Sequence, residues 1–139
     1  MSADDDLVMS AAGAHEAIRH LNHRTRRTIP APLAYDLLGN LGSLSHGLHQ
    51  LLRQLADGLD RSLTDYDVYD HNRDPADTVA AAGALLNDAR TYATRLGDLL
   101  NAAQAVINLQ GYHDNQPDLD QDHVDQDVDR ARVDQGHDA

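Results

Sequence analysis

Leucine recurs along residues 32–63 at alternating intervals of four and three, and this spacing limits the fold more than any other feature of the chain. The series consists of Leu37, Leu41, Leu44, Leu48, Leu51 and Leu55. Because an α-helix completes a turn in about 3.6 residues, such a series lies on one helix face, as in the seam of a coiled coil. The pattern predicts a helix over 32–63 with one broad apolar face, interrupted only by Ser45.

A second apolar series follows a short acidic link at residues 64–74. Its members recur every seven residues and are Val79, Leu86, Ala93, Leu100 and Ile107. This repeat predicts a helix over 75–110, for which Asp74 fits the N-cap and Pro75 fits the first helical position. Gly111 fits the terminator of the same helix. Two long helices joined by a short link predict a helical hairpin.

A further amphipathic helix is predicted over residues 3–27. Ser2 fits its N-cap, and three aspartates at 4–6 complement the positive end of the helix dipole. Its apolar face consists of Leu7, Ala11, Ala14, Ile18 and Leu21. Pro30 and Pro32 then separate this helix from the next one, because proline disfavours helical geometry in the residue before it.

The three apolar faces together predict an all-α fold. We expect an elongated three-helix bundle built on the long hairpin, forming one domain over residues 1–112. The apolar content is mostly leucine and alanine, without Phe or Trp, which suits helix packing better than a sheet. A monomeric bundle and a dimer with a four-helix core satisfy these apolar faces equally well.

Four glycines of the 32–63 segment fall outside its leucine face: Gly39, Gly42, Gly47 and Gly58. Glycine inside a helix is less favourable than alanine by about 0.5–1 kcal/mol. One interpretation is close approach by the first helix or by a second subunit, and the other is sequence drift in a GC-rich gene.

Residues 113–139 differ in composition from the rest, being rich in Asp, Gln and His. Low hydrophobicity with high negative charge predicts a disordered acidic tail. The spacing of Asp118, Asp120, Asp122 and Asp129 matches a calcium loop, but His123 stands where that loop needs glycine. A solubilising tail is the preferred interpretation.

The formal net charge of −12 works against non-specific binding to nucleic acid or to an anionic membrane. The absence of Cys excludes disulfides and thiolate chemistry. Acidic residues follow Met1 where a signal peptide would be positively charged, and no stretch approaches the about 20 apolar residues of a membrane span. We expect a cytoplasmic protein without membrane association.

Two clusters are candidates for an interaction surface. The acidic tip of the hairpin contributes Tyr66, Asp67, Tyr69 and Asp70. The basic end of the first helix contributes Arg24, Arg26 and Arg27. Tyrosine supplies large contact area at low entropic cost, whereas clustered arginines suit an acidic partner or nucleic acid. Pairing of the basic end with the acidic tip or tail of the same chain is a further use of these charges.

Histidines three residues apart share a helix face in two places, His20 with His23 and His46 with His49. With nearby carboxylates, the second pair is a candidate transition-metal site, but solvated surface histidines are the preferred interpretation. No nucleophile motif or phosphate-binding loop is evident. The sequence therefore assigns no catalytic, cofactor-binding or metal-binding residue.

The leading functional hypothesis is a non-enzymatic helical interaction module, acting through its helix faces and its acidic tip. Its partner would be another protein or a second copy of the chain. The alternative is a DNA-associated accessory or regulatory protein that uses the basic end, although net charge makes nucleic acid a poor partner. A metal-dependent hydrolase at the acidic tip is the least favoured of the three.

Overall fold

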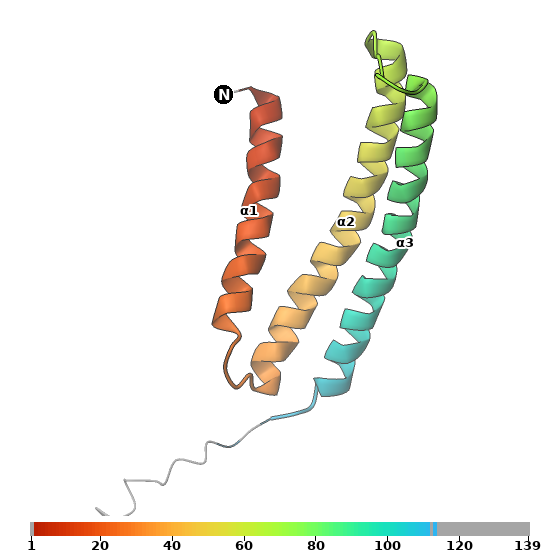
Figure 1. Cartoon of the computed structure of the whole chain (residues 1–139). Coiled ribbons are helices and arrows are strands. Elements are labelled where there is room, and N and C mark those ends of the chain that lie inside the picture. Colours follow the sequence, from red (N-terminus) through yellow and green to blue (C-terminus); the bar gives the residue numbers. More distant parts are fainter. Residues whose placement is uncertain (1, 112, 114–139) are drawn as a thin grey trace, which may run out of the picture.

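The computed structural model describes residues 2–111 and 113, and it folds them into three helices (Figure 1). These are α1 (Ala3–Arg24), α2 (Ala31–Asp65) and α3 (Pro75–Ile107), and each runs antiparallel to the one before it. The described residues form no strand. The predicted all-α fold with three helices is therefore confirmed. The predicted tail and its calcium-like spacing lie outside the described residues, except for His113.

The starts of α1 and α3 follow from the capping residues that the sequence supplies. At α1, the Asp5 amide donates to the Ser2 hydroxyl at 3.2 Å, while the Ser2 amide donates to the Asp5 carboxylate at 3.1 Å. The backbone amide of Ser2, helped by its side chain, stabilises the charged carboxyl and lowers the pKa of Asp5. At α3, the Asp74 carboxylate accepts a hydrogen bond from the Ala76 amide at 3.1 Å. Both caps are as predicted.

Two helices end earlier than their patterns suggested. The amide and the hydroxyl of Thr25 both donate to the carbonyl of Leu21, at 2.9 and 2.8 Å, and α1 ends there rather than at residue 27. Helix α3 ends at Ile107, before the predicted residue 110. No described glycine has a positive φ, so Gly111 does not terminate α3 through a left-handed conformation.

Helices α2 and α3 pack together along an interface centred on small residues. Its buried members are Gly42, Ser45, Ala93 and Gly97. On α3 the predicted seven-residue series lies in this interface, and all its members are buried or half-buried. On α2 the corresponding positions come one residue after the predicted leucines, and they are Leu38, Gly42, Ser45, His49, Leu52 and Ala56. Ser45, which interrupts the leucine face, is 2% exposed at the centre of the interface.

Glycine allows this close approach. A Cβ atom at Gly39 would lie 2.6 Å from the Gln104 amide nitrogen, and one at Gly42 would collide with the Asn101 side chain. Side chains of α3 therefore occupy the space beside Gly39 and Gly42, and the neighbour is α3 rather than α1 or a second subunit. A Cβ atom at Gly47 or Gly58 would have no neighbour within 4 Å among the described residues, and nothing in the structure explains these two glycines.

Helix α1 stands apart from the hairpin (Figure 1). Across the described helices, every Cα atom of α1 lies more than 8 Å from those of α2 and α3. Ile18 and Leu21 are half-buried, but Leu7, Val8 and Met9 at the other end are exposed. None of the described helices is long and apolar enough to cross a membrane.

Replacing Gly42 by valine tests the close approach of α2 and α3. We expect Gly42→Val to lower the free energy of unfolding by about 1–3 kcal/mol, because added methyl groups overpack the interface. Gly58→Val is the matched control on the same helix, and we expect it to stay within about 0.5 kcal/mol of the unmodified chain. Urea unfolding followed by circular dichroism measures both, and equal effects would contradict the packing described above.

Candidate functional site

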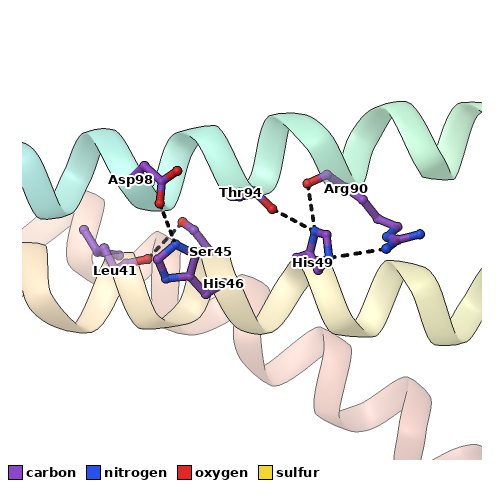
Figure 2. Close-up of polar contacts among 7 residues, drawn as sticks. All are labelled: Leu41, Ser45, His46, His49, Arg90, Thr94 and Asp98. Atoms are coloured by element: carbon purple, nitrogen blue, oxygen red, sulfur yellow. Dashed lines mark hydrogen bonds and ion pairs between the residues drawn. The ribbon is translucent and has the colours of Figure 1, made fainter.

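Polar side chains bridge α2 and α3 on either side of the buried small residues (Figure 2). His49 is the centre of this group. Its Nδ1 atom lies 2.8 Å from the Thr94 hydroxyl and 3.2 Å from the Arg90 carbonyl, and its Nε2 atom lies 3.3 Å from the Arg90 guanidinium. Because the guanidinium only donates and the carbonyl only accepts, these partners select the tautomer with the proton on Nδ1. His49 thus joins the helices as both donor and acceptor.

Further bridges extend the same interface towards the start of α2 and the end of α3. The Gln104 amide donates to the Tyr35 carbonyl at 3.0 Å, and His46 Nε2 lies 3.2 Å from the Asp98 carboxylate. The His46 ring is 41% exposed, so this pair lies at the solvent edge of the interface. Isolated exposed ion pairs contribute little stability, and their main effect here is to favour one register.

The interface corrects the sequence interpretation of the second histidine pair. His49 is a half-buried bridging residue, not a solvated one, and the signal that sequence reasoning missed was its position next to the small residues of the seam. A metal site shared by the two histidines is also poorly matched. The Arg90 guanidinium lies at Nε2 of His49, whereas Nε2 of His46 lies beside the Asp98 carboxylate. In the described part of the chain, no three His, Asp or Glu side chains are grouped to hold a metal ion.

Leu37 and Leu41 of the predicted leucine series are half-buried, but the rest of the series is exposed. Leu44, Leu48, Leu51, Leu55 and Leu59 are between 38% and 50% exposed, and we call this set the open leucine face. The residues one position before the α3 seam repeat the pattern, and Leu85, Tyr92, Leu96 and Leu99 are also exposed. Successive residues rotate in opposite senses on antiparallel helices, so a shift of one position moves both sets to the same side of the hairpin. The hairpin therefore carries one broad apolar side.

Helix α1 borders this apolar side without covering it. Ala14 and Ile18 line a shallow groove together with Leu44, Leu48 and Leu51 of α2. Towards the start of α1 the exposed Leu7 and Val8 add to the apolar surface. A contiguous apolar surface of this kind is typical of a protein–protein interaction site.

The acidic tip lies in the connection between α2 and α3. Tyr66 and Tyr69 are 73% and 80% exposed, and Tyr69 packs edge-on against His71. The Asp70 carboxylate accepts hydrogen bonds from the Thr78 hydroxyl and from the Asn72 amide. The Thr78 bond, followed by that of Asn72, lowers the pKa of Asp70. Asp70 thus ties the loop to the first turn of α3.

The two predicted clusters lie at opposite ends of the molecule. Arg24 ends α1, and Arg26 and Arg27 follow it into the connection to α2, whereas the tip lies beyond the far end of α2 (Figure 1). Helix α2 has 35 residues and is about 52 Å long at 1.5 Å per residue. The basic end and the acidic tip therefore do not form one site, and they do not pair within one chain.

Comparison with protein-family models, curated proteins and solved structures finds no match to this chain. The apolar side of the hairpin and the charged ends are consequently the features from which a function is argued.

The bridging role of His49 is testable by comparison with His46. We expect His49→Leu to lower the free energy of unfolding by about 1–3 kcal/mol, because it removes the bonds that the half-buried Arg90 and Thr94 make across the interface. His46→Leu changes the same residue type at the exposed edge, and we expect it to cost less than about 1 kcal/mol. Urea titration at one protein concentration measures both; a larger loss for His46→Leu would refute this assignment.

The lowered pKa of Asp70 gives a second prediction. A carboxyl whose folded-state pKa is depressed stabilises the fold above its unfolded pKa, and this contribution disappears as pH falls through the folded value. We expect Thr78→Val to raise the pKa of Asp70 towards its ordinary range, since the principal hydrogen bond is removed. Carboxyl NMR titration measures the shift, and Thr64→Val is the control that leaves it unchanged. An unaltered Asp70 in Thr78→Val would be the contrary result.

Proposed function

We propose that this chain is a non-enzymatic helical interaction module, and that it binds a protein partner through the open leucine face and the adjoining surface of α1. The observation that carries the proposal is the near absence of apolar burial. Among the described residues, Ala93 is the one hydrophobic residue that is buried, although leucines recur along all three helices. An apolar side chain that is fully buried contributes about 1.5–3 kcal/mol, so covering this surface supplies a strong driving force for association.

The shape of the surface favours a helical partner. The open leucine face repeats at intervals of four and three, which is the spacing that a facing helix reads in a groove or coiled-coil interface. Residues Tyr66 and Tyr69 of the tip provide additional contact area at one end of the same hairpin.

Nucleic acid is a poorer match to the same features. Arg24, Arg26 and Arg27 form a small cluster at one end of a chain whose formal net charge is −12. Such a net charge disfavours approach to the phosphate backbone, and the apolar side of the hairpin would remain uncovered in the complex. The proposal therefore rests on the helix faces and not on the basic end.

A charge introduced into the open leucine face tests the proposal. We expect the double variant Leu48→Asp with Leu55→Asp to bind the protein's partner at least about 30-fold more weakly, which is a loss of about 2 kcal/mol or more for buried anchors. The measurement is the set of proteins that the immobilised full chain retains from a lysate of its own organism, each then titrated individually against the variants.

The matched control is Gln50→Asp with Gln54→Asp, which adds the same charge to exposed positions of α2 outside the open leucine face. We expect this control to bind as the unmodified chain does. Equal binding by the leucine variant and the glutamine control would overturn the proposed function. Circular dichroism on both variants confirms that the helices are retained.

A further inference from the structure

The apolar series of α1 and α2 face each other in matching order. Ala14 and Ile18 of α1 line the same groove as Leu44 and Leu48 of α2. Because the helices are antiparallel and both series alternate by four and three, Leu7 comes level with Leu55 and Leu21 with Leu41. Yet α1 is more than 8 Å from α2 at every Cα pair of the described helices, so these matched surfaces do not close on each other. The space between them is bordered by apolar residues on both sides.

The charges at the two ends of α1 are opposite in sign. Asp4, Asp5 and Asp6 begin α1 at the end that also holds the acidic hairpin tip (Figure 1). The other end holds Arg24, Arg26 and Arg27, with His23 beside them. A second copy placed antiparallel to the first brings each acidic end against a basic end. A parallel copy brings like charges together, which is unfavourable.

The apolar spacing and the charges select the same antiparallel register. Heptad spacing alone permits an axis of symmetry at several levels along a helix. Pairing the Asp4 level of one α1 with the Arg24 level of another places the axis at Ala14, which also brings Leu7 level with Leu21 of the other copy. Ala14 lies at the level of Leu48 in the groove. On α2, an axis at Leu48 makes Leu41 level with Leu55, so each helix has one pair of leucines at matching levels.

The charges of α2 neither support nor oppose this register. The same axis brings Asp36 to the level of Asp60 and of its neighbour Arg61, so repulsion and attraction occur side by side. The preference for an antiparallel arrangement therefore comes from α1. The pattern is self-complementary, which is the requirement for an interface between two identical chains related by a twofold axis.

We infer that the partner at the open leucine face is a second copy of this chain, related by a twofold axis that crosses the helices at the level of Ala14 and Leu48. This inference rests on the proposed function, because it names the partner that binds the open leucine face. Helices α1 and α2 of both copies form a four-helix core, and the acidic start of each α1 lies beside the basic end of the other. Protein partners of other kinds are alternative outcomes of the test.

The solution mass of the full chain is the first measurement. We expect light scattering to give twice the chain mass of 15.2 kDa at micromolar concentration, and Leu48→Asp with Leu55→Asp to give a monomer. A monomer at every concentration up to about 1 mM would overturn the inference. The proposed function fails by a separate result, namely equal binding of other proteins by the leucine variant and the glutamine control.

Charge reversal tests the antiparallel register. We expect the triple change of Asp4, Asp5 and Asp6 to arginine to weaken the dimer at least 10-fold, since both ends of α1 then carry positive charge. Adding Arg24→Asp, Arg26→Asp and Arg27→Asp should restore dimerisation, because opposite charges meet again. If the charges acted only through the dipole of α1, the fully reversed variant would not recover. It would have positive charge at the start of the helix and negative charge at its end, and both are unfavourable. Failure to restore the dimer would overturn this register.

A single cysteine locates the axis directly, because the chain has no cysteine of its own. We expect Ala14→Cys to form a disulfide-linked dimer under mild oxidation, since residues on a twofold axis approach their own copies. Ala12→Cys is the control, because position 12 is exposed and lies outside the apolar series of α1. Crosslinking at least 10-fold faster for Ala14→Cys supports the inference, and equal rates overturn it.

Discussion

The close approach of α2 and α3 determines where the larger side chains of the hairpin lie. Gly42 and Ser45 meet Ala93 and Gly97 where the helices are nearest, and only small residues fit between two backbones at such a distance. The leucines of α2 and α3 are displaced to one side as a consequence. The two helices are in contact along their length, but their most hydrophobic residues remain partly exposed to water. The open leucine face is exposed because α2 packs on α3 through its small residues.

Polar bridges take the place that apolar side chains occupy in most helix pairs. His49 satisfies its hydrogen bonds through Thr94 and Arg90, but Nε of Arg90 is buried without a partner among the described residues. Buried polar groups add little net stability, although pairs that fit only one arrangement disfavour a shifted register. The hairpin thus has a defined alignment, while most of the available hydrophobic stabilisation depends on covering the open side.

The separation of acidic and basic residues along α1 follows from the preference of each helix end for one sign of charge. Acidic residues at the start of a helix and basic residues at its end are favourable for each helix alone, because they complement the helix dipole. The antiparallel arrangement of α1 and α2 then places the acidic start of α1 at the same end as the hairpin tip. The acidic start of α1 and the acidic tip therefore lie at one end of the molecule, and the basic end of α1 lies at the other.

The sequence by itself determined the helices, because capping residues and apolar periodicity act within a few turns of one helix. Ser2 and Asp74 placed the starts of α1 and α3, and the leucine series placed α2. The series from Val79 to Ile107 placed the α3 seam. Only the tertiary structure decided which face of α2 meets α3. Leucine periodicity favours burial of Leu44 and Leu48, whereas the packing of α2 on α3 places Ser45 and His49, one residue further along the chain, in the interface. The packing of α2 on α3 depends on residues of both helices, so the sequence of one helix alone does not predict which of its faces is buried.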